Sequence, residues 1–568
     1  MQKLELTWIG KNEKHVIEPR ILLHDPSKDY GDKDTENMLI HGDNLLALKA
    51  LEQKYTGKIK CIYIDPPYNT GARIDADGKE IGFDDNTEHS IWLNLMNRRL
   101  EILHKLLMYE GVIFVQIDDK ELVYLKMLMD EIWGRKNFLN MIVVKTSDPS
   151  GLKTVNPSPY SQTEYILMYA KDRTKYVYET QYVPCTYDIG YNRLIVNRDR
   201  DYTEWKSISI VEAILKNLGI DSLEEAKKIY GKLDFEQMIS EFAFKNSRSV
   251  YQATAISKKA GRAIVEGKEL SLQNPDKVVC VTRDTKDDVY ILNGRQIYFY
   301  ENKIHEVDGK KVVTKPLTNL WIDIPWNGIS GEGKVTFANS KKPEKLLKRI
   351  IEMTTNENDI VLDSFLGSGT TAAVAHKMKR KWIGIEFANH CYSHCKERLD
   401  RVIDGDRSGI SKIVNWQGGG GYKFYELAPS LIEKDKHGMP VFSKQYNPAM
   451  LAAAVAKING YVYAPDKDVF WKQGYSHDNS FIYVTTQYFT GEMLDSIASD
   501  LGPMENLLIC ASAFDIGLDR RYDNITVRKI PQTILDKCEY GITDEYNLNI
   551  VNPPVFEDEE LDDDEWRY

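Results

Sequence analysis

Residues 359–386, "DIVLDSFLGSGTTAAVAHKMKRKWIGIE", read as a strand, a glycine loop, a helix and a second strand. Gly367 and Gly369 stand where the backbone must turn tightly and let a ligand approach closely. Glu386 follows the loop by roughly 20 residues, where an acid at the end of a strand can accept hydrogen bonds from ribose hydroxyls. With Asp363 before the loop, this unit favours a parallel α/β sheet that binds a ligand containing adenosine.

The glycine loop narrows the ligand only in part. Thr370 stands where a phosphate-binding P-loop needs its lysine, so a nucleoside triphosphatase is not expected. Ala372 completes the G-x-G-x-x-A variant of the dinucleotide fingerprint, and an ordinary βα turn of small residues is the alternative. The loop alone does not separate a nicotinamide cofactor from S-adenosylmethionine.

A second motif, "CIYIDPPYNTG" at residues 61–71, ends a buried-strand pattern in a carboxylate and two prolines. Pro66 and Pro67 fix their backbone dihedrals and remove two N–H donors, which leaves a stiff loop. That loop offers acceptors, the Asp65 carboxylate and the Pro66 carbonyl, beside the flat ring of Tyr68. Two acceptors and a stacking ring suit a planar ring with an exocyclic amino group, such as adenine. The alternative is a proline-rich turn that only ends a strand.

Methyl transfer to an aryl amine would use such a loop. The lone pair of the amine is delocalised into the ring, and two acceptors that hold its hydrogens would localise that pair. The amine could then attack a methyl sulfonium, with positioning and electrostatics supplying the catalysis. In duplex DNA the base must first be flipped out, and Tyr68 would replace the lost stacking.

The motifs "DPPYNTG" and "DSFLGSGTT" resemble the catalytic and cofactor motifs of amino-group DNA methyltransferases. The catalytic motif comes first and a long variable region separates the two, which resembles the β class, a circular permutation of the doubly wound methyltransferase sheet. The resemblance implies S-adenosyl-L-methionine as cofactor and Asp65, Pro66, Pro67 and Tyr68 as catalytic residues. It implies a cofactor site made of Asp43, Phe337, Asp363, Phe365, Gly367, Gly369, Thr370 and Glu386, with Asp43 near the cofactor adenine.

The flanking segments are similar to the Mod subunits of type III restriction–modification systems. They are "LTWIGKN", "TNLWIDI" and "FANSKKPEKLLKRIIEMTT", and the resemblance covers about residues 1–430. It implies an adenine-N6 enzyme acting on double-stranded DNA, a homodimer, and a Res helicase–nuclease partner for cleavage. The alternatives are a standalone or phage-defence methyltransferase of adenine-N6 or cytosine-N4 type, a nicotinamide-dependent oxidoreductase, and a DNA-specificity module without activity of its own.

Strand–helix alternation, its interruption over 176–320 and the resemblance together predict three domains, one of them in two parts. Residues 1–175 and 321–429 form the two parts of the methyltransferase domain, 176–320 a tyrosine-rich target-recognition domain with hairpins, and 430–568 a C-terminal α+β segment. Within the first part, apolar residues at helical spacing predict a helix over 90–111 that ends at Gly111.

The net charge of −11 does not exclude a nucleic-acid partner, because eight acidic residues lie in the tail between 557 and 565. Candidate contacts to DNA phosphates are Arg193, Arg198, Lys245, Arg248, Lys258, Lys259 and Arg262. For the stretch 244–262 the alternative is a solvated helical face.

The remaining features predict a cytoplasmic protein without a membrane partner. Seven cysteines show no disulfide rhythm, and neither a signal peptide nor an apolar run of transmembrane length is evident. "HCYSHC" at 390–395 does not have a zinc spacing, so we interpret it as part of a helix over 388–403 and expect no metal.

Overall fold

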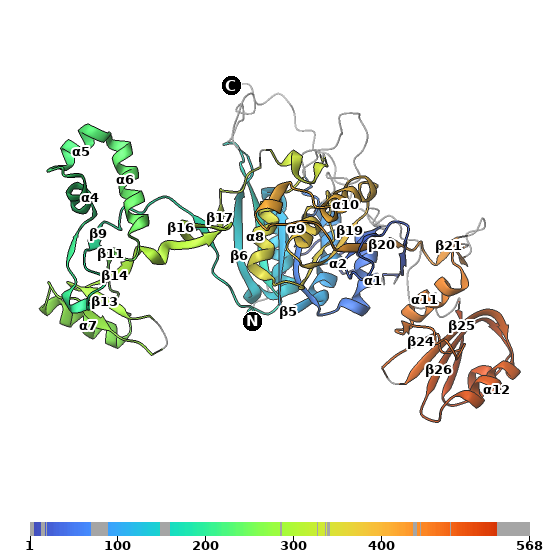
Figure 1. Ribbon diagram of the computed structural model, residues 1–568. Coiled ribbons are helices and arrows are strands. Elements are labelled where there is room, and N and C mark those ends of the chain that lie inside the picture. Colours follow the sequence, from blue (N-terminus) through green and yellow to red (C-terminus); the bar gives the residue numbers. More distant parts are fainter. Residues whose placement is uncertain are drawn as a thin grey trace, which may run out of the picture. The chain divides into compact units, whose positions relative to one another are not determined.

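The computed structural model describes residues 5–12, 17–18, 20–69, 89–147, 159–284, 287–326, 328–335, 337, 341–434, 440–443, 445–477 and 479–530. The acidic stretch 557–565 lies outside these residues. The chain forms two compact units, Met1–Glu179 with Asn319–Tyr568, and Thr180–Thr318 (Figure 1).

The first unit is built on one large sheet with the strand order β1-β20-β3-β19-β18-β4-β5-β7-β6-β17, and β2 pairs with β20 (Figure 1). The strands are β1 (Leu22–His24), β2 (Tyr30–Gly31), β3 (Met38–His41), β4 (Ile59–Ile64), β5 (Leu107–Ile117), β6 (Phe138–Lys145), β7 (Thr163–Ala170), β17 (Leu320–Trp321), β18 (Ile360–Asp363), β19 (Lys381–Glu386) and β20 (Gly421–Leu427).

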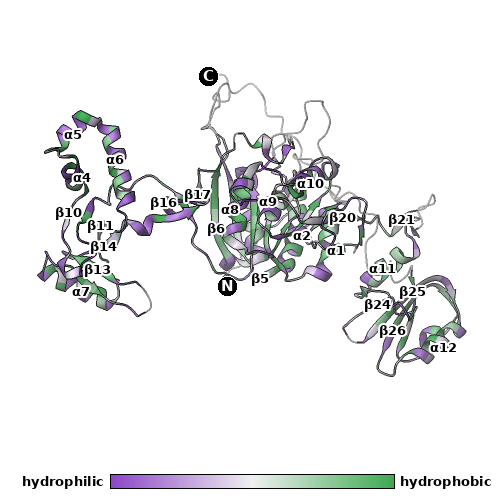
Figure 2. Cartoon of the chain, in the orientation of Figure 1, coloured by the Kyte–Doolittle hydropathy of each residue, from purple (hydrophilic) through white to green (hydrophobic). Residues whose placement is uncertain are grey.

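The strand order interleaves two distant parts of the chain. β18 and β19 lie between β3 and β4, and all five strands from β3 to β5 run parallel. β7 runs antiparallel to its neighbours β5 and β6, and β1 and β2 at the other end of the sheet pair antiparallel with β20. Parallel strands need apolar residues on both faces, and Figure 2 shows hydrophobic residues gathered on this sheet. The predicted circularly permuted, doubly wound sheet is therefore confirmed.

Helices pack in two groups around the sheet. One group is α1 (Asn44–Tyr55), α2 (His89–Leu106) and α3 (Asp119–Met129), and the other is α8 (Glu344–Thr354), α9 (Thr370–Lys377) and α10 (Glu397–Ile403). Asp43 accepts a hydrogen bond from the Leu46 N–H at 2.9 Å and so caps α1 directly after β3. The first group contacts β19, β5 and β7, and the second contacts β4, β18 and β19.

The predicted helix over 90–111 is wrong at its C-terminal end. α2 ends at Leu106, and Leu107 already lies opposite Ile59 as the first residue of β5. Leu106, Leu107 and Met108 fit a helical or an extended pattern equally well, and pairing with the buried strand β4 decides between them.

The second unit contains a six-stranded antiparallel sheet, β10-β9-β11-β14-β13-β12, and a three-stranded sheet, β15-β16-β8. The strands are β8 (Tyr182–Pro184), β9 (Arg193–Ile195), β10 (Ser207–Ser209), β11 (Val250–Ala255), β12 (Val279–Val281), β13 (Val289–Leu292), β14 (Arg295–Phe299), β15 (Ile304–Val307) and β16 (Lys310–Pro316). The helices are α4 (Ile210–Leu218), α5 (Leu223–Tyr230), α6 (Lys232–Lys245) and α7 (Arg262–Gln273). The interpretation of 244–262 as a helical face is wrong, because its centre is strand β11.

After β20 the chain forms an α+β segment, as expected. It contains the hairpin β21 (Ile432–Lys434) and β22 (Pro440–Phe442), α11 (Pro448–Ile458), α12 (Gly491–Asp500), and the sheet of β23 (Val462–Tyr463), β24 (Gly474–Tyr475), β25 (Ser480–Phe489), β26 (Asn506–Phe514) and β27 (Ile525–Lys529). None of the helices among the described residues has the length and apolar character needed to cross a membrane.

Candidate active site

The carboxyl ends of β18 and β4 meet at the point where the sheet reverses its winding. The two strands are parallel neighbours, with Leu362 opposite Ile62, and the chain leaves β18 toward β19 but β4 toward β5. Asp363 ends β18 and Asp65 directly follows β4. Ligands of open α/β sheets bind in the crevice at such a switch point. The topology thus brings both predicted motifs to one place.

The loop after β4 is held rigidly by side chains. The Tyr68 hydroxyl donates to Asp65 Oδ1 at 2.6 Å, and the Trp92 indole donates to the Pro67 carbonyl at 2.8 Å. Asn69 adopts a left-handed conformation with φ of 57°, and its amide donates to Glu121 Oε1 at 2.8 Å. The Asp65 carboxylate, the two prolines and the Tyr68 ring are therefore fixed before any ligand binds.

Two charged residues that the sequence analysis did not single out complete this site. Lys342 Nζ lies 3.0 Å from Asp65 Oδ2 and 3.5 Å from Glu164 Oε2, and it donates to the Tyr68 hydroxyl at 3.0 Å. Burial raises the pKa of Asp65, while the two carboxylates raise the pKa of Lys342 against its own burial. Glu164 also accepts from the Gln116 amide at 2.5 Å. The signal available in sequence was only a lysine before Pro343 and an acid at the start of β7.

The glycine loop after β18 is organised by two carboxylates. Glu386 Oε2 accepts from the Gly367 N–H at 2.6 Å. Its Oε1 accepts from the backbone N–H groups of Phe387 and Ala388. Asp363 accepts from the Phe365 N–H at 2.9 Å and from the Thr371 hydroxyl at 2.6 Å, and burial raises its pKa to about 7. Gly367 and Gly369 have φ of 57° and 79°, a region that favours glycine.

A buried network of charged side chains contacts the glycine loop at Thr370. Arg398 donates to the Thr370 hydroxyl at 2.6 Å and to Glu344 Oε1 at 2.8 Å. Lys377 lies 2.9 Å from Glu344 Oε2 and 3.5 Å from Asp406 Oδ2. The Arg398, Lys377 and Glu344 side chains are 0% exposed. The predicted contact residue Thr370 is thus fixed by an arginine that sequence patterns gave no reason to select.

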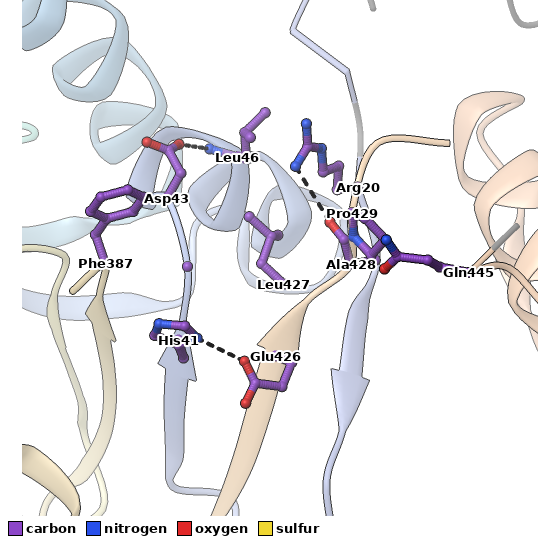
Figure 3. Close-up of a pocket in the computed structure, with 11 residues that line it drawn as sticks. Arg20, His41, Asp43, Leu46, Phe387, Glu426, Leu427, Ala428, Pro429 and Gln445 are labelled. Carbon is purple, nitrogen blue, oxygen red and sulfur yellow. Dashed lines mark hydrogen bonds and ion pairs between the residues drawn. The ribbon is translucent and has the colours of Figure 1, made fainter. Parts of the chain in front are cut away.

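A cavity of about 360 Å³ opens at the carboxyl ends of β3 and β20 (Figure 3). Figure 3 shows the Phe387 ring beside the Asp43 carboxylate, both on the cavity wall. An exposed aromatic ring and an acceptor form a pairing that suits adenine. Phe387 was missed, although an aromatic residue directly after Glu386 was the available signal. The cavity is lined by Arg20, His41, Gly42, Asp43, Leu46, Phe387, Glu426, Leu427, Ala428, Pro429 and Gln445.

Phe337 and the stretch 390–395 pack beside the glycine loop. The Phe337 ring contacts the ring of His390 edge-on at 5.2 Å between centroids, and the Cys395 thiol donates to the Gly367 carbonyl at 3.0 Å. The stretch forms a π-helical turn, Cys391–Lys396, that continues into α10. Among the described residues there is no cluster of His, Cys, Asp and Glu suited to a metal ion.

The residues at these strand ends fit an adenosine-containing cofactor. Ser364 in the loop is buried, and its hydroxyl has no hydrogen-bond partner within the described part of the chain, as expected for a group that meets a ligand. Glu386 ends β19 and is followed by Phe387, while Asp43 follows the neighbouring strand β3. A cofactor with a ribose and an adenine ring would meet these groups in turn.

The predicted DNA contacts all lie in the second unit. The predicted cofactor and catalytic residues belong to the first. Six of the seven are exposed: Arg193, Lys245, Arg248, Lys258, Lys259 and Arg262. Arg198 is half-buried, with its guanidinium 4.1 Å from the Trp205 ring centroid and 4.2 Å from that of Phe299. Arg262 pairs with Glu266 at 2.7 Å.

The permuted sheet, the glycine loop and the rigid acceptor loop together define a cofactor-dependent α/β enzyme with a second ligand site at its switch point. The family model described as "DNA methylase" (N6_N4_Mtase) matches residues 59–397, from the start of β4 to the start of α10. The chain belongs to this DNA methylase family. Membership decides against the nicotinamide-dependent oxidoreductase that the glycine loop alone left open.

Curated relatives include Mod subunits of type III restriction–modification enzymes. The HindVI Mod subunit of Haemophilus influenzae, named as a probable one, is 38% identical over 422 residues, which are 69% of this chain and 54% of that protein. The EcoP15I Mod subunit of Escherichia coli is 26% identical over 508 residues, 77% of this chain and 73% of that protein. The chain thus spans about half the length of the HindVI relative.

Proposed function

We propose that this protein is a DNA methyltransferase that transfers a methyl group from S-adenosyl-L-methionine to the N6 amino group of adenine in double-stranded DNA. The observation that carries the proposal is the meeting of the two motifs at neighbouring strand ends, Asp65 after β4 and Asp363 at the end of β18. An amine acceptor and a cofactor loop side by side are the minimum that such a transfer needs.

Each part of the site has a task in this reaction. Glu386, Asp43 and Phe387 hold the adenosine part of the cofactor, which when bound supplies an electrophilic methyl group. Asp65 and the Pro66 carbonyl accept the two hydrogens of the target amine and so localise its lone pair. Pro67 keeps the acceptors rigid. The Tyr68 ring stacks on the base after it leaves the duplex.

We further propose that the chain acts as the modification subunit of a type III system in the cytoplasm. In this proposal residues 176–320 recognise the target sequence, and their exposed cations contact DNA phosphates. The subunit would form a homodimer, and a Res helicase–nuclease would supply cleavage. The similarity to two Mod subunits supports this assignment. The C-terminal segment 430–568 would then form a separate domain for contacts to such partners.

A second candidate product is N4-methylcytosine, because the matched family model covers both N6 and N4 enzymes. The aspartate that opens the "DPPY" motif favours adenine. The deciding experiment incubates the purified protein with S-adenosylmethionine and unmethylated DNA of mixed sequence, digests the DNA and weighs the nucleosides. N6-methyladenine is the expected product. N4-methylcytosine would overturn the base assignment and keep the chemistry. Cofactor binding without any methylated nucleoside would favour a specificity module.

A further inference from the structure

We propose that Lys342 and Glu164 are positioning residues of the methyl transfer: Lys342 holds the Asp65 carboxylate ionised and oriented toward the target amine, and Glu164 balances the lysine charge. This inference rests on the proposed methyltransferase function. The two residues reach the catalytic loop from elements far along the chain; Lys342 lies in the flank "FANSKKPEKLLKRIIEMTT", and the motifs imply no role for either residue.

Lys342 touches three members of the site at once. Its ammonium lies 3.0 Å from Asp65 Oδ2, 3.0 Å from the Tyr68 hydroxyl and 3.5 Å from Glu164 Oε2. The residue is 8% exposed, so these contacts replace its hydration. The preceding Lys341 serves a different purpose, since its ammonium donates to the backbone carbonyls of Ser330 and Val335.

Glu164 is the second carboxylate beside Lys342, and hydrogen bonds from the sheet hold it in place. Its Oε2 lies 3.0 Å from the Tyr68 hydroxyl and accepts from the Gln116 amide at 2.5 Å, and Gln116 in turn accepts from the Tyr63 hydroxyl at 2.6 Å. Gln116 is fully buried, which fixes the carboxylate in place. The glutamate is therefore built into the sheet and is not a chance surface neighbour.

The charges of the cluster favour the reaction. Asp65, Glu164 and Lys342 carry a net charge of −1, and the amine gains positive charge as it is methylated. Each Asp65 oxygen already accepts one hydrogen bond, from Tyr68 or Lys342, and a carboxylate has about four lone-pair sites, so room for the amine hydrogens remains. Without the ammonium, burial and the neighbouring acid would both favour a protonated Asp65, which cannot accept equally well.

The groups that face Asp65 come from five parts of the chain. Tyr68 lies on its own loop, Tyr63 on β4 and Glu164 on β7, and Lys342 precedes α8. Asp363 at the end of β18 adds a further like charge. Of these neighbours only Lys342 is a cation. The Tyr68 hydroxyl, which donates to Asp65, also opposes its protonation, but Lys342 does so with a full positive charge.

The test measures the pH dependence of methyl transfer to mixed-sequence DNA for four proteins: wild type, Lys342→Met, Glu164→Gln and the double variant. In Lys342→Met the acid limb of the rate profile should move up by about one to three pH units, the effect of a close opposite charge on a carboxylate. In Glu164→Gln the limb should move down. In the double variant it should return toward wild type. Lys342→Arg keeps the cation and should keep the wild-type limb.

Two controls separate positioning from packing. Lys345→Met removes a half-exposed lysine from the first turn of α8, whose Nζ lies 3.9 Å from Asp323, and should leave the limb in place. Calorimetric affinity for S-adenosylmethionine should be the same in wild type, Lys342→Met and Glu164→Gln. A Lys342→Met profile that is lower at every pH but not displaced overturns the inference, as does a limb that moves the same way in both single variants. A wild type that transfers no methyl group refutes the proposed function itself.

Discussion

The buried network beneath the glycine loop predicts a large loss of stability when Arg398 is replaced by methionine. Glu344 and Asp406 balance Lys377 and Arg398, and three of these four side chains are 0% exposed. Arg398→Met leaves one uncompensated negative charge in the interior. Breaking a buried pair in this way costs about 3–5 kcal/mol. The variant also removes the hydrogen bond of 2.6 Å to the Thr370 hydroxyl.

Thermal unfolding followed by circular dichroism measures this loss. For a body larger than 250 residues each kcal/mol corresponds to about 2 °C or less, so we expect a decrease in Tm of about 5–10 °C. The matched control is Arg401→Met on the same helix, whose half-exposed guanidinium pairs with Glu397 at 3.2 Å. Such an exposed pair contributes less than about 1 kcal/mol.

Affinity for S-adenosylmethionine supplies a second readout, because Thr370 begins α9 beside the cofactor loop. We expect Arg398→Met to weaken it and Arg401→Met to leave it unchanged. If Arg398→Met has the same Tm and the same cofactor affinity as the control Arg401→Met, the view that this network holds the loop is refuted.

Two further predictions concern the carboxylates of the proposed cofactor site. Glu386→Gln should weaken calorimetric binding of S-adenosylmethionine by about tenfold or more, since hydrogen bonds to a charged group contribute about 1.5–3 kcal/mol; equal affinity would contradict the role of Glu386. Asp363, with its pKa raised to about 7 by burial, takes up a proton as the pH falls through that value and loses its attraction for a sulfonium. Cofactor affinity should therefore be lower at pH 6 than at pH 8, and an identical slope in Asp363→Asn would rule this carboxylate out as the source.

The arrangement of the core could be predicted from sequence because local patterns carry it. Apolar runs that end in Asp65 and Asp363 mark two parallel strands, and the order of their motifs indicated the permuted sheet. Gly367 and Gly369 marked the loop as glycines in the sequence, and both have a positive φ in the structure. These signals depend on residues close together in the chain.

The residues that complete the site could not be predicted, because long-range contacts select them. Lys342 and Tyr68 are 274 positions apart, and Glu164 and Tyr68 are 96 apart. A lysine before a helix and an acid at the start of a strand are common surface features. Only the folded sheet brings them to Asp65. The prediction for the end of α2 was wrong for the same reason, since pairing with the neighbouring strand decides the conformation of Leu107.

The central claim is that Asp65 positions the target amine beside the bound cofactor. Its most direct test is single-turnover methylation of mixed-sequence DNA by wild type and Asp65→Asn, each shown by calorimetry to bind S-adenosylmethionine. We predict N6-methyladenine from the wild type and none from the variant, at comparable cofactor affinity. Methylation by Asp65→Asn at a rate close to wild type would contradict the account.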